Sequence, residues 1–243
     1  MARRYHTAFI LIVLIVVTSL SGCTGEAQEI TEEFNSEYEV HDDTVLKVIT
    51  FNGEIKIESW DGDTVVLNAI KRTRFGQNEF ENVKIEVSES EGELIIETKH
   101  LKDWVSRVSV DISLKVPDNV AVEYVKTSNG NIEIKGTEGI GDLDSSNGDI
   151  EVEVLDIARD IEIKSKNGAI DVYLNPSLNA DIDASTSNGE ISMDDLELEL
   201  VSSSRDEIKG KLGDGGSRIE ISTANGDVDL FELDFYEEVE EGE

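Results

Sequence analysis

The chain has 243 residues, and its 54 acidic residues against 21 Lys and Arg give a formal net charge of -33. This balance excludes binding of nucleic acid through its phosphates, which requires a basic patch. The acid excess is typical of a solvated surface in a salty medium, and the alternative interpretation is a surface that binds cations or a basic partner.

The N-terminus carries an export signal. Arg3 and Arg4 precede an apolar run over residues 8–17, which is too short to span a bilayer and is followed by "LSGC", ending at Cys23. "LSGC" resembles the lipobox of prokaryotic lipoproteins, in which the cysteine becomes the lipidated first residue. We therefore expect a lipoprotein signal peptide over residues 1–22. Cys23, the only cysteine, would hold the exported chain at the outer face of the cytoplasmic membrane or at the cell surface. An ordinary signal peptide or an uncleaved anchor is the alternative.

Three further parts follow the signal. The polar, acidic residues 23–40 are expected to be a tether, residues 41–233 a single β domain, and residues 234–243 a frayed acidic tail. Period-two alternation predicts half-buried strands within the β domain over residues 64–72, 83–89, 93–99 and 108–116. The stretch 75–106 is irregular, and "LKDWVSR" around Trp104 is expected to be a loop.

A repeat of Ser/Thr, any residue, Asn-Gly and alternating aliphatic residues recurs along the chain. Counted from each Asn, the residues two and four positions before it and three and five positions after it are the ones expected to face inward. A straight strand would keep the same parity on both sides, so the chain must turn or bulge at Asn-Gly. Gly adopts the positive φ that such a turn needs, and Asn tolerates it. The predicted structural turns are Asn52, Gly53, Asn129, Gly130, Asn147, Gly148, Asn167, Gly168, Asn188, Gly189, Asn225 and Gly226.

Two all-β architectures fit this pattern. Asn-Gly is a strong hairpin signal, which favours an antiparallel β-sandwich or meander. The alternative is a parallel β-solenoid with one corner per coil, and the separations of 18, 20 and 21 residues between Asn129, Asn147, Asn167 and Asn188 favour coils of about 20 residues. On this interpretation the separations of 77 and 37 residues correspond to about four and two coils. The Ser/Thr hydroxyls are expected to stack and hydrogen-bond between rungs.

Three segments carry a family resemblance: "NGEIKIESWDGDTVVLNAIKR", "VSVDISLKVPDNVAVEYVKTSNGNIEI" and "GKLGDGGSRIEISTANGDVDL". With them the chain resembles the DUF4097-like "putative adhesin" family of exported prokaryotic proteins, a domain of unknown function related to head-domain families. The resemblance covers most of the mature chain and implies a single-stranded right-handed parallel β-helix, with no catalytic residues to transfer. Between Asn188 and Asn225 the sequence departs from the pattern, where "LELELVSSSRDEIKGK" is expected to form one coil without Asn-Gly.

Candidate catalytic groups are scarce. His41 and His100 have no motif context and are expected to be surface residues, and "GDGGSR" from Gly213 is expected to be a turn. We therefore expect no enzyme and no cofactor. Aromatic residues that could bind a surface glycan are Trp60, Trp104, Tyr124 and Tyr173, although aromatics on strand faces usually pack.

If the coils stack in register, outward side chains form columns about 4.8 Å apart. One column, Glu133, Glu151 and Asp171, is a hypothetical metal site that would collect Ca²⁺ or other cations, and solvated carboxylates that splay apart are the alternative. A second column, Lys126, Asp144 and Lys164, alternates in sign and would neutralise itself.

The sequence thus favours a non-enzymatic, lipid-anchored cell-surface β-solenoid for adhesion, binding or scaffolding. Its partners would be the membrane, through Cys23, and a surface glycan or protein, but no nucleic acid. The alternatives are an extracytoplasmic sensor partner of an envelope regulator and a degenerate polysaccharide-active β-helix enzyme.

Overall fold

The computed structural model describes residues 28–41, 43–90, 92–101 and 107–234. Within these residues the chain forms 19 strands and one short 3₁₀ helix, η1 (Gln77–Asn82). The strands are β1 (Ile30–Glu39), β2 (Val45–Ile49), β3 (Ile55–Trp60), β4 (Thr64–Thr73), β5 (Val83–Ser90), β6 (Glu93–His100), β7 (Ser109–Pro117), β8 (Ala121–Thr127), β9 (Ile132–Lys135), β10 (Asp142–Asn147), β11 (Ile150–Val154), β12 (Ile161–Asn167), β13 (Ile170–Leu174), β14 (Ala180–Thr186), β15 (Ile191–Asp194), β16 (Glu199–Ser203), β17 (Glu207–Leu212), β18 (Ser217–Asn225) and β19 (Val228–Glu232).

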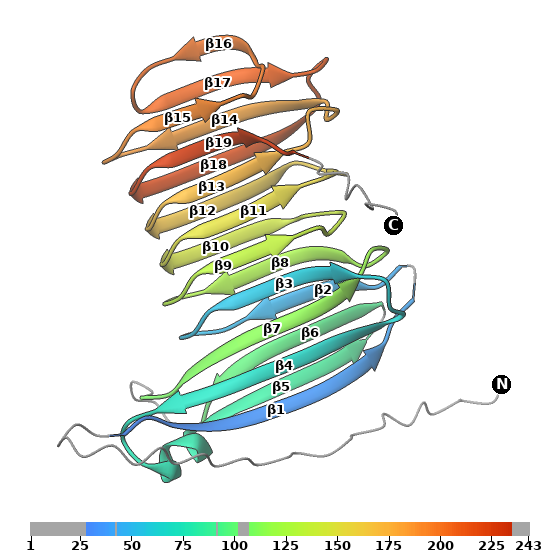
Figure 1. The fold of residues 1–243 in the computed structure, drawn as a ribbon, viewed down its shortest axis with the longest axis vertical. Helices are drawn as coiled ribbons and strands as arrows, with labels where there is room; N and C mark the ends of the chain where they lie inside the picture. Colours follow the sequence, from blue (N-terminus) through green and yellow to red (C-terminus); the bar gives the residue numbers. More distant parts are fainter. Residues whose placement is uncertain (1–27, 42, 91, 102–106, 235–243) are drawn as a thin grey trace, which may run out of the picture.

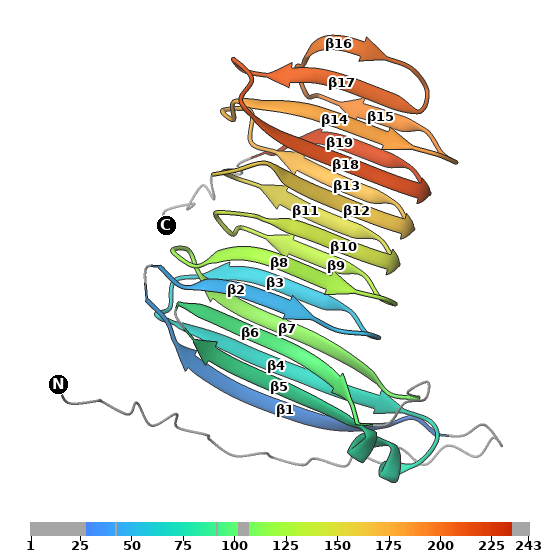
Figure 2. The same cartoon turned by 180° about the vertical axis from the view of Figure 1, so that it is seen from behind.

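The strands lie in two facing sheets that run the length of the molecule (Figures 1 and 2). Sheet A has nine strands in the order β1-β4-β7-β3-β9-β11-β13-β19-β15, and sheet B has ten in the order β16-β17-β14-β18-β12-β10-β8-β2-β6-β5. Each rung consists of one sheet B strand followed by one sheet A strand. Where the repeat occurs, the Asn-Gly corner joins the two, and these corners form the sharply pointed left edge in Figure 1.

The centre of each sheet is parallel. β8, β10, β12, β18 and β14 pair in parallel in sheet B, and β9, β11, β13, β19 and β15 do so in sheet A. The prediction of an all-β parallel solenoid is confirmed, and the antiparallel sandwich is wrong for this region. Antiparallel pairing is confined to the two ends of the solenoid. At one end β4 pairs with β1 and β7, and β5 pairs with β6; at the other end β17 pairs with β14 and β16.

The rungs do not stack in chain order, which corrects two predictions from spacing. Asn52 bridges Asn129 directly, so the 77 residues between them place no further coil between these corners. Those residues instead form β4, the β5–β6 hairpin and the rung β6–β7 on the far side of β2–β3. Likewise the segment between Asn188 and Asn225 is no coil, because β16 and β17 form an antiparallel hairpin on β14. The last rung, β18–β19, then lies between β12–β13 and β14–β15.

The N-terminal boundary of the fold also differs from the prediction. Residues 30–39, assigned from sequence to a tether, form β1 and pair over their whole length with β4. The available signal was the alternation of Phe34, Ser36 and Tyr38 with Asn35, Glu37 and Glu39, but the acidic character of the segment concealed it. The predicted strands over 64–72, 83–89, 93–99 and 108–116 are confirmed as β4 to β7. The signal peptide, Cys23, Trp104 and the residues after 234 lie outside the described residues.

Aliphatic columns from both sheets form one continuous core between them. Ile132, Ile150 and Ile170 are at most 1% exposed in sheet A, and Val125, Leu143 and Ile163 are equally buried in sheet B, which confirms the predicted parity change at Asn-Gly. Burial of such columns is the main driving force for folding, at about 25 cal/mol per Å² of apolar surface. The prediction fails at β15, the edge strand of sheet A, where Ile191 is only partly buried and Met193 is 36% exposed.

Candidate functional site

The six Asn-Gly corners form an amide ladder along one edge of the solenoid. The spatial order of the asparagines is 52, 129, 147, 167, 225 and 188. Each Asn after Asn52 donates from Nδ2 to the Oδ1 of the Asn before it in this order, at 2.6 to 3.1 Å. Each donor is therefore directed along the stack, as expected for in-register asparagine. The sequence repeat predicted the positions of the corners. It did not predict which two Asn side chains are neighbours, because the rungs do not stack in chain order.

The Ser/Thr residue two positions before each Asn is buried and bonds between rungs, as predicted. Its partner differs from the expected hydroxyl in the next rung. Ser145, Ser165 and Thr223 donate to the Gly carbonyl oxygens of the adjacent corner, at 3.2, 3.0 and 2.9 Å. A hydroxyl pair occurs only where no such glycine is present, between Thr98 and Thr50 at 3.1 Å. These bonds satisfy buried polar atoms inside an apolar core.

The glycine of each corner is required by close approach of the next rung. A Cβ added at Gly148 would lie 2.0 Å from the carbonyl oxygen of Gly130, and one at Gly168 would lie 2.1 Å from that of Gly148. The space that a side chain would use is thus filled by backbone, so no other residue fits without moving a rung.

The outer face of sheet A carries the predicted acidic column in the predicted register. Glu133 lies opposite Glu151, and Glu151 opposite Asp171. In the lower half lysines neutralise the column: Lys56 pairs with Glu133 at 2.8 Å, and Lys135 pairs with Glu133 at 3.0 Å and with Glu151 at 2.8 Å. Lys56 and Lys135 accordingly hold the pKa of the Glu133 carboxyl below its ordinary value.

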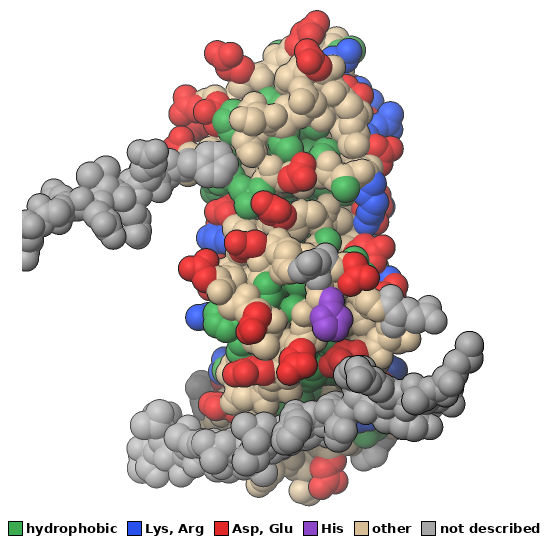
Figure 3. Space-filling view, turned by 90° about the vertical axis from the view of Figure 1, so that its right-hand side faces the viewer, with side chains coloured by type: hydrophobic (Ala, Val, Ile, Leu, Met, Phe, Trp, Pro, Cys, Tyr) green, Lys and Arg blue, Asp and Glu red, His purple; other side chains and the backbone are tan. Residues whose placement is uncertain are grey.

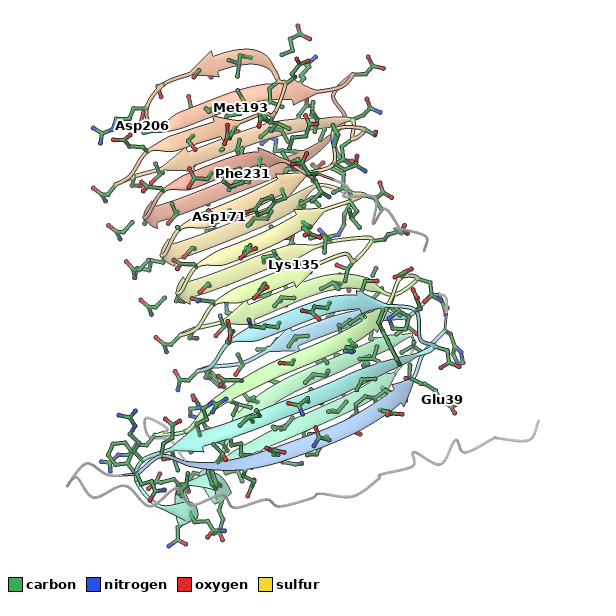
Figure 4. The ribbon with its side chains drawn as sticks, in the orientation of Figure 1. Glu39, Lys135, Asp171, Met193, Asp206 and Phe231 are labelled. Atoms are coloured by element: carbon green, nitrogen blue, oxygen red, sulfur yellow. The ribbon has the colours of Figure 1, made fainter. Side chains whose placement is uncertain are left out.

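The upper half of the column has no such neutralisation. Asp171 lies opposite Asp229 of β19, and Ser192 donates to the Asp229 carboxylate. Of the ion pairs among the described residues, none includes either aspartate. Burial raises the pKa of the Asp171 carboxyl, and the charges of Asp229 and Glu151 raise it further. In Figure 4 Asp171 lies above Lys135 on the same face.

An aromatic pair flanks these carboxylates. Tyr173 stacks on Phe231 with ring centroids 4.8 Å apart and an interplanar angle of 17°. Both side chains are partly exposed on sheet A, two residues beyond Asp171 and Asp229 in their strands. We call Asp171, Tyr173, Asp229 and Phe231 the carboxylate–aromatic patch. Asp229 and Phe231 were missed from sequence because the spacing placed "TANGDVDLFE" two coils beyond Asn188 and so about three coils beyond Asn167, although it repeats "KNGAIDVYL" position by position.

The second predicted column, on sheet B, is confirmed in register and partly in pairing. Lys126 forms an ion pair with Asp144, as expected. Lys164 lies opposite Asp144 but pairs with Glu162 in its own strand at 2.6 Å. Sheet B therefore presents charges of both signs, unlike the upper half of sheet A.

The remaining candidate binding residues do not form a common surface. The indole N–H of Trp60 donates to the Thr64 carbonyl at 2.9 Å within the β3–β4 connection, and Tyr124 lies in sheet B. His100 packs against Phe51, with ring centroids 4.6 Å apart, and the backbone N–H of His41 donates to the Thr44 hydroxyl. The edge opposite the amide ladder shows acidic side chains along its length (Figure 3).

The structure also contains a cavity that sequence reasoning missed. It measures about 390 Å³ and lies at the β1 and β5 end of the solenoid, where Phe34, Phe80, Val83 and Ile85 line it. The ammonium group of Lys71, also in its lining, donates to Glu32 at 2.7 Å.

The residues described by the structure contain no group of three or more His, Cys, Asp or Glu side chains placed to hold a metal ion. Lys56 and Lys135 compete for two of the three carboxylates expected to bind Ca²⁺. Calcium binding by Glu133, Glu151 and Asp171 stays a prediction, and a calorimetric titration with Ca²⁺ would test it.

Comparison with known proteins finds one family model and several solved structures that are similar to this chain. Residues 118–230 match the family model described as Toastrack DUF4097. The fold is similar to that of a "putative cell adhesion protein" from Clostridium sporogenes, with a TM-score of 0.63 and 13% identity over 84% of this chain and 100% of that one. A "putative adhesin" from Bacteroides fragilis covers 83% of this chain and 97% of its own, with a TM-score of 0.29 and 12% identity. No curated protein sequence matches. In the part of the chain that the structure describes, no helix has the length and apolar character needed to cross a membrane.

Proposed function

We propose that the chain, whose residues 118–230 match the Toastrack DUF4097 family model, is a non-enzymatic, lipid-anchored adhesion module of the cell surface. Its carboxylate–aromatic patch binds a protein partner that presents Lys or Arg side chains. The single observation that carries the proposal is the pair of uncompensated carboxylates, Asp171 and Asp229, in line with Glu133 and Glu151, which lysines neutralise.

Charge supports a cationic partner over other ligands. The Asp171 carboxyl has a raised pKa because it is partly buried beside like charges. A partner ammonium or guanidinium within about 4–6 Å would favour its charged form and reverse that cost. The net charge of -33 would also steer a basic partner toward the chain.

The aromatic pair supports a protein rather than a glycan. A sugar stacks on a free ring face, whereas Tyr173 and Phe231 cover one face of each other. An Arg side chain can bind the carboxylates in bidentate fashion and lay its apolar stem along the rings. The parallel strands beneath hold these four side chains in register, which limits the entropy lost on binding.

The anchor rests on the sequence alone. The export signal and Cys23 at the lipobox position support attachment to the outer face of a membrane. Labelling of cells with a fatty-acid analogue should mark the chain and fail to mark a Cys23→Ala variant. Equal labelling of both would refute the anchor.

The binding proposal is tested with the folded chain immobilised on a surface and titrated with an Arg/Lys-rich peptide. The test variant carries Asp171→Asn and Asp229→Asn. The matched control carries Glu162→Gln and Glu220→Gln, which removes the same charge from the same two rungs on the opposite sheet.

We expect the test variant to bind the peptide about tenfold more weakly or worse, since each carboxylate contributes on the order of 1 kcal/mol near a surface. The control variant should bind within about twofold of the parent, and added salt should weaken binding. Equal losses in both variants would mean that only net charge acts. Capture of surface glycan without peptide binding would favour adhesion through another chemistry.

A further inference from the structure

We propose that Asn188 is a site of spontaneous deamidation through a succinimide, and that the fold protects the other five Asn-Gly pairs of the amide ladder. Asn188 and Gly189 form the corner between β14 and β15, the last corner of the ladder. In Figure 1 this corner is the left tip of β14 and β15, below the turn between β16 and β17.

The chemistry needs a free backbone N–H after the asparagine. The nitrogen of Gly189 attacks Cγ of Asn188 and forms a C–N bond, while the Cγ–Nδ2 bond breaks and the amide leaves as ammonia with the proton lost from the glycine nitrogen. Water then opens the five-membered ring at either carbonyl, which yields Asp or isoaspartate at position 188. No electron transfer occurs, and water is the only co-reactant. Glycine favours the step because it has no side chain to hinder the attack.

In five corners this nitrogen is held by the neighbouring rung. The glycine N–H donates to the backbone carbonyl of the next Asn along the stack, so the nitrogen cannot turn toward its own side chain without breaking a bond. The five bonds run from Gly53 to Asn129 at 2.8 Å, from Gly130 to Asn147 at 2.8 Å, from Gly148 to Asn167 at 2.9 Å, from Gly168 to Asn225 at 2.9 Å and from Gly226 to Asn188 at 3.1 Å.

Gly189 has no rung above it. None of the hydrogen bonds among the described residues uses its N–H, and none reaches Oδ1 of Asn188 from the outer side. The turn between β16 and β17 passes over the neighbouring residues only, because Thr186 donates to the Asp206 carbonyl at 3.0 Å and Ile191 to the Arg205 carbonyl at 2.9 Å. Figure 4 shows Asp206 beside this corner.

The product would alter the end of the solenoid. Nδ2 of Asn188 now donates to the Ala224 carbonyl at 3.0 Å and to Oδ1 of Asn225 at 3.1 Å. A carboxylate in its place offers no donor to either oxygen and repels both, so the terminal rung should loosen. Isoaspartate would also lengthen the backbone at this corner.

The test is peptide mapping of the full chain by mass spectrometry after prolonged incubation at mildly alkaline pH, with isoaspartate detected enzymatically at each Asn-Gly pair. We expect conversion at Asn188 to be about tenfold faster than at each of the other five, which is the protection expected from one held hydrogen bond. Conversion at an interior corner that equals or exceeds that at Asn188, or no conversion at Asn188, would overturn the proposal.

Two controls separate the fold from the local sequence. Incubation in denaturant should bring all six pairs to similar rates, and a preference for Asn188 that persists there would mean that sequence, not protection, sets the rate. An Asn188→Gln variant, whose longer side chain disfavours the five-membered ring, should remove the fast phase while the rates at the other five stay unchanged.

Discussion

Replacement of Gly148 by Ala tests the close stacking of the corners most directly. The new Cβ would lie 2.0 Å from the carbonyl oxygen of Gly130, whereas carbon–oxygen contacts in proteins need about 3.3 Å. The corner must therefore move by about 1.3 Å. Such a shift breaks the bonds from Gly148 to Asn167 at 2.9 Å and from Ser145 to Gly130 at 3.2 Å. With about 1 kcal/mol for each bond and 1–3 kcal/mol for Ala at φ 156°, we expect a loss of about 4 kcal/mol.

The assay is urea unfolding followed by circular dichroism, with the slope compared between variants. A loss of about 4 kcal/mol is a large part of the 5–15 kcal/mol that stabilises a typical domain. Two controls divide the effect. Gly76→Ala has φ 103° but no atom within 4 Å of the new Cβ, so it should cost only about 1 kcal/mol. Gly168→Ala meets backbone at 2.1 Å without a φ in the left-handed range, so it should keep only the share of the loss that comes from the clash, about 2 kcal/mol. A Gly148→Ala variant within about 1 kcal/mol of the parent would refute the reasoning.

Three further predictions concern the ladder, the core hydroxyls and the acidic face. Asn147→Asp should lower the free energy of unfolding by about 1–3 kcal/mol at neutral pH. A carboxylate would face two acceptors, Oδ1 of Asn129 and the Ser128 carbonyl, to which Nδ2 now donates at 2.9 and 3.1 Å. A variant as stable as the parent in urea would contradict this. Ser165→Ala should cost about 1–2 kcal/mol, since the Gly148 carbonyl loses its 3.0 Å donor, and Ser165→Thr, which keeps the hydroxyl, is the control. Asp171→Asn should stabilise the fold by up to about 1 kcal/mol at pH 7. Because the pKa of Asp171 is raised in the folded state, the folded state binds more protons than the unfolded state. The parent therefore gains stability as the pH falls toward the ordinary pKa of an Asp carboxyl, and the advantage of the variant should disappear in acid. An advantage that stays constant with pH would exclude this cause.

Local features of the fold were predictable from sequence because they depend on local chemistry. The Asn-Gly corners, the parity change and the outward columns follow from period-two patterns on either side of a turn, and the structure confirms them around Asn129, Asn147 and Asn167. The order of the rungs was not predictable in this way. Each copy presents the same edge, so β18 can pair as well beside β12 as at the end of the stack, and spacing along the chain does not distinguish these places.

The candidate site was only partly predictable for the same reason. Asp171 and Tyr173 were identified, but their neighbours Asp229 and Phe231 come from a copy 58 residues further along, which β19 brings beside β13. The lysines that neutralise the lower column arise from different positions, Lys56 in register with Glu133 and Lys135 from the next outward residue. Predicting that these lysines neutralise Glu133 and Glu151 requires the side-chain positions as well as the strand register.

The first and the last coil along the chain both lie inside the stack and not at its ends. β2–β3 lies between β6–β7 and β8–β9, and β18–β19 lies between β12–β13 and β14–β15. During synthesis the place between β12–β13 and β14–β15 therefore stays vacant until β18 and β19 have left the ribosome. Such late, long-distance closure is slow compared with adding one coil to the next. Once this place is filled, the first and the last coil of the chain are each held between two neighbouring rungs, so neither can detach without parting the stack.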